Sequence, residues 1–456
     1  MIRPYSRPLI LALAVALAGC GTFKQAKPKT PVIGNRVPIL VSETNADVDP
    51  GLAAVDVLLP VQIVNDSWTQ AGGNAAKSMG HLGLGAEPKQ VWDARVNAGY
   101  KKRSRLAAAP VVSGGRLFIV DAMARLHAFN ADTGAKLWTV FVGDEKDSKG
   151  GVSFWSGEAT GVSGALFGGG VSAEGDRVYA TNGLGDVVAL SAADGSIIWK
   201  KRPGGPLRGA PTLFAGNLFV VSQDNQLFAL RQSDGNVEWT DSATLEVSGV
   251  FGVAAPAAGQ GTVVAGFSSG ELDAFRYENG RPLWQDALSR TSISTSVATL
   301  SDIDAPPVVD QGRVIAIGAG GRMVSLDLFT GQRLWEINAA GISMPWVAGE
   351  WAFVVTEDAR LLAVARSNGR VRWATQLSRY RKEKKKTGAI GWKGPVLAGG
   401  RLVLTNSLGQ IISVDPTNGQ IQSVIKKAGK GFSLAPVVAN NMLFLVDDKG
   451  RLTAWR

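Results

Sequence analysis

The chain has 456 residues, of which 45% are hydrophobic and 19% are charged, and its formal net charge is +10. This apolar content can bury a large core and excludes a disordered or fibrous protein. The single cysteine excludes an intramolecular disulfide, and two histidines leave almost no ligands for an ordinary zinc site. Because 56 glycines favour many tight turns over long helices, an all-β fold is expected.

The N-terminus has the features of an export signal. Arg3 and Arg7 form a basic region, residues 9–17 (LILALAVAL) form an apolar stretch too short to span a bilayer, and small residues lead up to Cys20. The sequence Leu-Ala-Gly-Cys that ends at Cys20 resembles the bacterial lipobox, in which the cysteine becomes the first mature residue and carries the lipid. Residues 1–19 are therefore expected to be a lipoprotein signal peptide, with lipidation at Cys20.

Residues 20–60 are rich in Lys, Pro, Thr, Val and Asp without a clear helix or strand pattern, so they are expected to form a flexible tether. Gly21 follows the cysteine, whereas an Asp there signals retention at the inner membrane. The expected location is therefore the outer membrane on its periplasmic side, which excludes nucleic acid as a partner. No later stretch has 18 consecutive apolar residues, so residues 61–456 are expected to be attached to the membrane only through acyl chains.

An eleven-residue motif that ends in Trp recurs along the rest of the chain. Each copy predicts a strand, a two-residue turn and another strand, because the glycine of the turn supplies the positive φ that a tight hairpin needs. A second alternating pair of strands precedes each copy, so each repeat predicts four antiparallel strands. The copies end at Trp138, Trp199, Trp239, Trp284, Trp335, Trp373 and, in an eroded form, Ser423.

The repeats predict a ring of eight blades. From Trp92 to Arg456 they average roughly 46 residues each, close to the length of four-stranded propeller blades. The last motif starts at residues 453–455 and lacks its outer strand, whereas residues 89–96 (KQVWDARV) form a strand with no preceding blade. Pairing the two would close the ring and remove the open sheet edges that favour aggregation. We therefore expect one eight-bladed β-propeller closed by an N-terminal strand, with the Trp side chains packed between blades rather than binding a ligand.

Other candidate sites in the sequence are weak. His81 and His127 are isolated, and packed or capped histidines are favoured over a catalytic base. No serine lies in a G-x-S-x-G setting, so hydrolase chemistry has no support. Two insertions, residues 143–168 and the basic stretch 379–386 (RYRKEKKK), are expected on a propeller face, where partners usually bind. For the basic stretch the alternatives are a solvated run of charge and a contact with anionic lipid or an acidic partner.

The motif A-x-D-x-x-T/D-G-x-x-x-W resembles the quinoprotein-type propeller repeat over nearly all of Trp92 to Arg456. Two families with opposite functions share this repeat, the pyrroloquinoline-quinone alcohol dehydrogenases and the BamB lipoproteins of the outer-membrane β-barrel assembly machinery. The lipobox, the length and the eight blades resemble the BamB family. Residues 283–309, which contain LSDIDAPP, and residues 167–182 are also similar to a blade connection and to the start of the second blade in that family.

The BamB resemblance implies a scaffold that is not an enzyme and has no cofactor or metal. It implies that the protein docks BamA and assists the assembly and insertion of β-barrel proteins into the outer membrane. The implied partners are BamA, the rest of the Bam complex and, as a further candidate, unfolded outer-membrane protein clients.

The same resemblance places the BamA contact on two blade connections. One contains Asp302 and Asp304, whose carboxylates are expected to point to the same side of an extended segment and to face a basic partner surface. In the other, residues 244–252, Leu245 and Val247 match an apolar pair of the family, but a serine follows where an Arg is expected.

Two alternatives remain: a quinone-dependent dehydrogenase, and a scaffold for another envelope complex. The dehydrogenase needs a catalytic carboxylate, a calcium ion held by carboxylate and amide oxygens, and usually an adjacent Cys-Cys disulfide. The chain has no Cys-Cys pair, and Glu158 and Glu174 lie in glycine-rich loops without calcium-loop spacing. Co-purification from solubilised outer membrane would separate the two scaffold alternatives.

Overall fold

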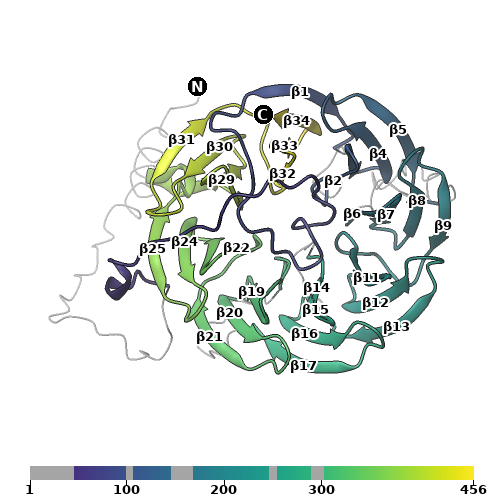
Figure 1. Ribbon diagram of the computed structural model, residues 1–456, viewed down its shortest axis with the longest axis horizontal. Helices are drawn as coiled ribbons and strands as arrows, with labels where there is room; N and C mark the ends of the chain where they lie inside the picture. Colours follow the sequence, from purple (N-terminus) through teal and green to yellow (C-terminus); the bar gives the residue numbers. More distant parts are fainter. Residues whose placement is uncertain (1–45, 99–105, 145–167, 246–253, 289–301) are drawn as a thin grey trace, which may run out of the picture. The chain divides into compact units, whose positions relative to one another are not determined.

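Antiparallel strands make up nearly all of the regular structure in the computed structural model, which describes residues 46–98, 106–144, 168–245, 254–288 and 302–456. These residues belong to the unit Glu43–Arg456. Helical structure in these ranges is limited to two short 3-10 turns, η1 (Pro50–Leu52) and η2 (Glu383–Lys385), and no described helix has the length and apolar character needed to cross a membrane. Eight four-stranded sheets form a ring of blades (Figure 1), which confirms the predicted eight-bladed β-propeller.

Each blade runs from an inner strand at the channel to an outer strand at the rim. Blade 1 contains β2 (Val111–Ser113), β3 (Arg116–Val120), β4 (Arg125–Asn130) and β5 (Lys136–Phe141); blade 2 contains β6 (Gly169–Glu174), β7 (Arg177–Asn182), β8 (Val187–Ser191) and β9 (Ile197–Lys201). Blade 3 contains β10 (Thr212–Phe214), β11 (Asn217–Val221), β12 (Gln226–Arg231) and β13 (Val237–Ser242); blade 4 contains β14 (Ala257–Gly259), β15 (Thr262–Gly266), β16 (Glu271–Arg276) and β17 (Pro282–Ala287). Blade 5 contains β18 (Val308–Asp310), β19 (Arg313–Ile317), β20 (Arg322–Asp327) and β21 (Arg333–Asn338); blade 6 contains β22 (Trp346–Ala348), β23 (Trp351–Val355), β24 (Arg360–Ala365) and β25 (Val371–Gln376). Blade 7 contains β28 (Trp392–Ala398), β29 (Arg401–Asn406), β30 (Ile411–Val414) and β31 (Ile421–Ile425); a separate hairpin precedes it, formed by β26 (Tyr380–Lys382) and β27 (Thr387–Ala389).

Blade 8 combines the two ends of the propeller sequence. Its strands β32 (Val437–Ala439), β33 (Met442–Val446) and β34 (Arg451–Trp455) come from the C-terminus, and its outer strand β1 (Gln90–Arg95) comes from the N-terminal side. β1 pairs antiparallel with β34, with Trp92 opposite Ala454. The predicted closing strand is therefore confirmed.

The repeated tryptophans pack between blades, as the sequence predicts. A Cβ atom built on Gly134 would lie 2.5 Å from the Trp92 ring of the preceding blade, so glycine is required by contact as well as by its φ of +72°. The indole N–H of Trp92 donates to Ala131 O at 3.0 Å. The same pattern continues around the ring with Trp138, Trp199, Trp239, Trp284, Trp335 and Trp373, whose indoles donate to backbone carbonyls of the next blade at 2.8–3.3 Å.

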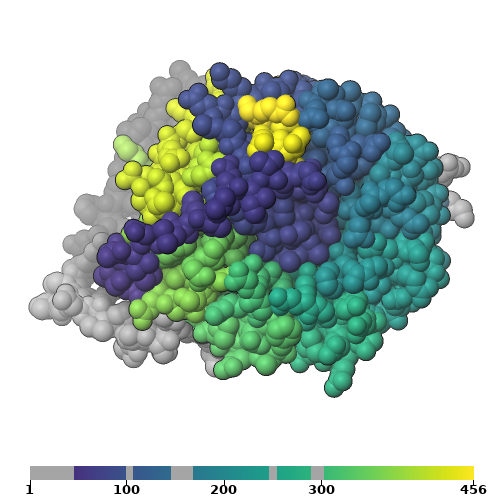
Figure 2. Space-filling view, viewed as in Figure 1, coloured from purple at the N-terminus to yellow at the C-terminus, as the bar shows by residue number. Residues whose placement is uncertain are grey.

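Residues 65–84, which we call the clasp, run around the channel and bond to every blade. The contacts follow the ring in the order blade 8, then blades 1 to 7, and they join backbone groups or short side chains of the clasp to the inner strands or the turns that follow them. The hydrogen-bonded pairs are Asn65 with Val438 and Asn440, Trp68 with Val112, Thr69 with Ala173, Gln70 with Leu213, Ala75 with Ala258, Ala76 with Val309, Gly80 with Trp346, and Leu82 with Leu397 and Gly399. The N-terminal segment consequently covers the centre of the ring (Figure 2).

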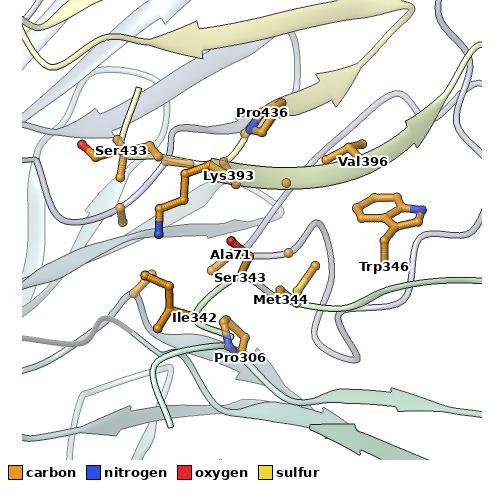
Figure 3. A pocket seen from close by; sticks show the side chains of 18 of the residues that line it. Ala71, Pro306, Ile342, Ser343, Met344, Trp346, Lys393, Val396, Ser433 and Pro436 are labelled. Carbon is orange, nitrogen blue, oxygen red and sulfur yellow. The ribbon is translucent and has the colours of Figure 1, made fainter. Parts of the chain in front are cut away.

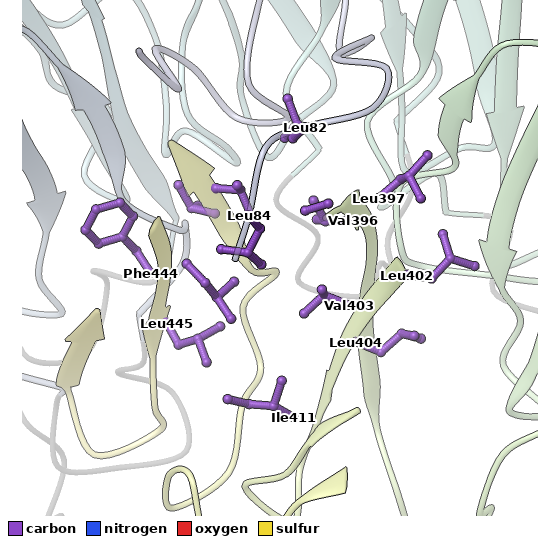
Figure 4. Close-up of a cluster of buried hydrophobic side chains, with 14 of the residues drawn as sticks. Leu82, Leu84, Val396, Leu397, Leu402, Val403, Leu404, Ile411, Phe444 and Leu445 are labelled. Carbon is purple, nitrogen blue, oxygen red and sulfur yellow. The ribbon is translucent and has the colours of Figure 1, made fainter. Parts of the chain in front are cut away.

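The clasp is also anchored by apolar packing. Leu82 and Leu84 are 1% and 6% exposed and belong to a hydrophobic cluster that extends over blades 6, 7, 8 and 1; Figure 4 shows its part in blades 7 and 8. Trp68 stacks on Trp346 with ring centroids 6.0 Å apart. Burial of such side chains stabilises the clasp by roughly 1.5–3 kcal/mol for each aliphatic group.

Residues 46–60 lie within the range predicted as a tether, yet they contact blade 6. Val48 forms a parallel bridge with Val371, and Asp49 N donates to Val371 O at 2.9 Å. The Arg372 guanidinium donates to Val55 O at 2.7 Å. The end of this range is therefore bound to the propeller, and the remainder of the range lies outside the described residues.

The alternation of antiparallel strands gives the ring two distinct faces. The turns between the first and second strands of each blade meet the clasp, so we call that side the clasp face. The connections from one blade to the next, and the turns between second and third strands, lie on the opposite side, which we call the connection face. Hairpin β26–β27 and the segment before β18 belong to the connection face, as do both ends of the insertion at residues 143–168.

Candidate functional site

Asp302 and Asp304 lie at the inner rim of the connection face, just before β18, but they are not exposed. Asp302 is fully buried and Asp304 is 7% exposed. Arg208, which precedes β10 in blade 3 and is 3% exposed, places Nη2 2.7 Å from Asp302 Oδ1 and 3.3 Å from Asp304 Oδ1. The three side chains form a buried ion cluster that joins blades 3 and 5.

This cluster corrects the expectation that the carboxylates of Asp302 and Asp304 face a basic surface of a partner. The carboxylates do share one side of the segment, since both meet the same guanidinium nitrogen, but the basic group that neutralises them is Arg208 of the chain itself. Burial, together with the charge of Asp302, raises the pKa of Asp304 above its ordinary value. A partner cannot reach buried carboxylates without moving the segment, so a direct docking role for Asp302 and Asp304 remains a prediction that their burial disfavours.

Asp304 also borders a cavity of about 140 Å³ on the channel axis, which we call the axial pocket. Trp68 and Gly72 of the clasp and Trp346 line it together with Lys393, which reaches in from β28 (Figure 3). The remaining lining consists mostly of small and apolar residues that precede the inner strands or lie within β28. Among them are Ala107, Ala108, Ala109, Ala210, Pro306 and Pro436, which precede inner strands, and Pro395 of β28.

A buried lysine lies in the clasp itself. Lys77 is 1% exposed, and its Nζ donates to Thr212 Oγ1 at 3.2 Å. Burial lowers the pKa of Lys77 to about 7, because the protein interior disfavours the charged ammonium. Burial therefore favours the neutral amine at this position.

The two histidines have the packed roles that the sequence favours. His81 Nδ1 lies 2.8 Å from Pro60 O, and the backbone N–H of Gly400 donates to its Nε2 at 3.0 Å. His127 is held between Asp121 at 2.9 Å and Thr139 at 3.0 Å. Both rings are buried and fully engaged by neighbours, so neither is placed to act as a base.

Of the other predicted site residues, Leu245 is exposed, and Val247 and Cys20 lie outside the described residues. Leu245 is 70% exposed at the connection face after β13. Val247, its predicted apolar companion, lies outside the described residues, as does Cys20. Arg208 and Lys77 are the charged residues that the sequence analysis missed. A lone Arg or Lys in a turn has no distinctive pattern, and only the three-dimensional fold reveals that it is buried.

The chain is similar to known proteins over most of its length. Residues 145–375 match the family model described as "Outer membrane protein assembly factor BamB". The chain belongs to the BamB family. BamB proteins similar to it include one from Yersinia pestis, 28% identical over 371 residues that cover 81% of this chain and 88% of that protein. The BamB of Escherichia coli is 28% identical over 359 residues, which cover 78% of this chain and 86% of that protein.

Solved structures agree with the BamB fold. BamB from Moraxella catarrhalis has a TM-score of 0.63 and 18% identity, covering 81% of this chain and all of that one. A quinohemoprotein alcohol dehydrogenase from Comamonas testosteroni has a TM-score of 0.64 and 13% identity, covering 86% of this chain and 80% of that one. Residues 87–200 also match a model described as "Glucose/ethanol/alcohol dehydrogenase, beta-propeller domain". At these identities the likeness between the structures concerns the fold alone.

The residues around the channel of this BamB-family protein do not fit a quinone cofactor held with calcium. Such a site needs several carboxylate and amide oxygens around one cavity. Asp304 is already paired with Arg208, and within the described ranges no three His, Cys, Asp or Glu side chains come together as a metal site. Glu174 is exposed at the end of β6, and Glu158 lies outside the described residues. The axial pocket is also smaller than the roughly 300–1,000 Å³ of most small-molecule sites.

Proposed function

We propose that this protein is a non-enzymatic scaffold of the β-barrel assembly machinery, which docks BamA and assists the assembly and insertion of β-barrel proteins into the outer membrane. The observation that carries this proposal is the family match over residues 145–375, together with relatives named as outer membrane protein assembly factors that align over most of their length. The engaged carboxylates of the axial channel further favour a scaffold over a dehydrogenase.

The fold supplies what a scaffold needs. An outer-strand tryptophan bonds the next blade at seven of the eight junctions, and the clasp bonds to all eight blades, so the loops of the connection face are presented from a rigid ring. Loops on a rigid framework are the usual sites of partner binding. We place the BamA contact on this face, around the connection after β13 that carries Leu245 and Val247. Unfolded barrel strands could add to an exposed blade edge by β-augmentation.

The substitution Leu245→Asp tests this placement. Because Leu245 is 70% exposed, a charge there leaves the fold intact but removes an apolar contact from the interface. We expect BamA recovery in pull-downs from detergent-solubilised outer membranes to fall at least about tenfold, with an unchanged melting temperature. Leu58→Asp is the matched control, because Leu58 is 75% exposed but lies near Gly349 of the clasp face.

The outcomes of this pull-down distinguish the alternatives. Equal BamA recovery with both variants would show that BamA docks at another surface, without contradicting the proposed function. If mass spectrometry finds no Bam component with the unmodified protein and instead finds another envelope complex, the scaffold belongs to that complex.

We further propose that the protein is an outer-membrane lipoprotein, anchored on the periplasmic side through Cys20 after removal of residues 1–19. Cys20→Ala should move the protein from the membrane fraction to the soluble periplasmic fraction, because no other attachment is expected. The melting temperature of the propeller should not change, since Cys20 is expected to precede the propeller and the first strand of the ring begins at Gln90. Retention of the variant in washed membranes would contradict the lipid anchor.

A further inference from the structure

A groove of about 780 Å³ lies on the connection face between blades 7 and 8. Five separate segments form it: the end of β1, hairpin β26–β27, the turn between β29 and β30, the connection between β31 and β32, and the turn between β33 and β34 with the start of β34. Its lining consists of Asp93, Arg95, Arg381, Ser407, Leu408, Lys427, Gly429, Lys430, Asp447, Lys449 and Arg451.

The groove is strongly cationic. Six of its lining residues are Lys or Arg and two are Asp, and both carboxylates are already engaged. Asp447 is 2% exposed and accepts the backbone N–H groups of Lys430, Lys449 and Arg451, while Asp93 pairs with Arg451 at 3.3 Å. The acids therefore shape the groove and leave most of its positive charge uncompensated.

Three of the lysine side chains in the groove form no ion pair with a described acidic residue. Lys427, Lys430 and Lys449 are exposed, and no described residue forms an ion pair with their ammonium groups. Lys427 has a φ of +62°, a conformation that is rare outside glycine and Asn. Lys427 and Lys430 come from the connection between blades 7 and 8, Lys449 comes from a turn of blade 8, and all three line the same groove.

The basic stretch noticed in the sequence forms one wall of this groove. Residues 379–386 make up β26, η2 and the turn before β27, and Arg381 both lines the groove and donates to Ser407 O at 3.4 Å. The other cations of the hairpin are exposed, and Glu383 is its single acid. The hairpin thus extends the positive potential of the groove beyond the surface of the blades.

The junction of blades 7 and 8 also departs from the repeat. At the other blade junctions an outer-strand tryptophan bonds the next blade, but blade 7 carries Ser423 at that position of β31. The cationic groove therefore lies at the one junction where the repeated indole is replaced.

We propose that this groove binds an extended acidic peptide segment of a protein partner. The positive charges lie on the walls of a concavity between two blades and a raised hairpin, so a ligand must enter the groove to meet them all. A flexible chain of Asp and Glu side chains can do so, whereas a flat bilayer surface would meet mainly the tip of the hairpin. The inference does not depend on BamA docking, since the groove lies on blades 7 and 8 and Leu245 follows blade 3.

The test measures binding of a fluorescein-labelled deca-glutamate peptide to the purified full chain in detergent by fluorescence anisotropy. Lys427→Glu, Lys430→Glu and Lys449→Glu together should weaken binding at least about tenfold at low ionic strength, and raising the salt should weaken binding of the unmodified protein. The matched control carries Lys89→Glu, Lys136→Glu and Arg281→Glu. These three residues are exposed at the start of outer strands or in a turn on the clasp side, and they give the same change in net charge.

Each outcome decides the proposal. A loss of binding in the groove variant with near-normal binding in the control supports it. Equal losses in both variants would show a response to net charge alone and overturn it. Groove-dependent binding to phosphatidylglycerol vesicles without binding to the peptide would also overturn it, in favour of a membrane contact. Circular dichroism of both variants establishes that the fold is retained.

Discussion

Replacing Trp92 by Ala should lower the free energy of unfolding by about 3–5 kcal/mol, the range for large buried aromatic side chains. Trp92 lies on the closing strand β1, is 8% exposed, and contacts Phe444 with ring centroids 5.9 Å apart. Its indole also donates to Ala131 O of blade 1, so the substitution removes packing and a hydrogen bond at the point where the ring closes. Urea denaturation followed by tryptophan fluorescence and by circular dichroism measures the loss.

The control for this prediction lies on the same strand. Val91 is 51% exposed, and Val91→Ala preserves the backbone pairing with β34 without opening a cavity. It should leave the denaturation midpoint nearly unchanged. If Trp92→Ala behaves like Val91→Ala, the junction between blades 8 and 1 does not depend on the indole.

Arg208→Met should destabilise the protein by about 3–5 kcal/mol at neutral pH, as expected when one partner of a buried ion cluster is removed. The methionine keeps much of the side-chain volume, but Asp302 and Asp304 lose the cation that both contact. Arg231→Met is the control, because Arg231 pairs with Asp234 and Glu238 at the surface. Exposed pairs contribute little, so that variant should unfold near the normal midpoint.

The pH dependence of the Arg208 variant separates an electrostatic effect from a packing effect. Without the guanidinium, whose charge lowers the pKa of Asp304, the folded-state pKa of this buried carboxyl rises further above its unfolded value. Such groups favour the folded state at low pH, and this contribution is lost as the pH rises through the folded-state pKa. The destabilisation should therefore be smaller at pH 5 than at pH 8. A loss of stability that is the same at both pH values would assign the role of Arg208 to packing.

The propeller could be predicted from the sequence because the same hairpin motif recurs along the chain. Seven copies of a hairpin motif report the same local geometry, so an eroded copy such as the one at Ser423 does not obscure the pattern. The partnership of β1 with β34 followed from counting strands: one motif lacked its outer strand and one strand lacked a blade. Both inferences depend on short-range signals, which a single sequence carries well.

The buried ion cluster and the clasp could not be predicted in the same way. Asp302 and Asp304 lie in a loop with Pro306 and Pro307, a pattern typical of a solvated turn, and their burial depends on Arg208 two blades away. The clasp contains no sequence repeat and no regular secondary structure. Its residues bond to one blade after another instead of to each other in a regular pattern. In both cases the residues that form the contact are far apart in the sequence, so no local sequence pattern predicts it.

The clasp also has a consequence for the order in which the protein can fold. Asn65 bonds Val438 across a separation of 373 residues, and β1 pairs with a strand at the extreme C-terminus. A chain that emerges N-terminus first therefore makes residues 65–95 early, but the partners of Asn65 and of β1 exist only after the last blade has been made. Contacts of such long range form slowly. Until then Trp92 lacks its contact with Phe444 and the ring stays open, and this interval is when the chain is most exposed to aggregation and most in need of a chaperone.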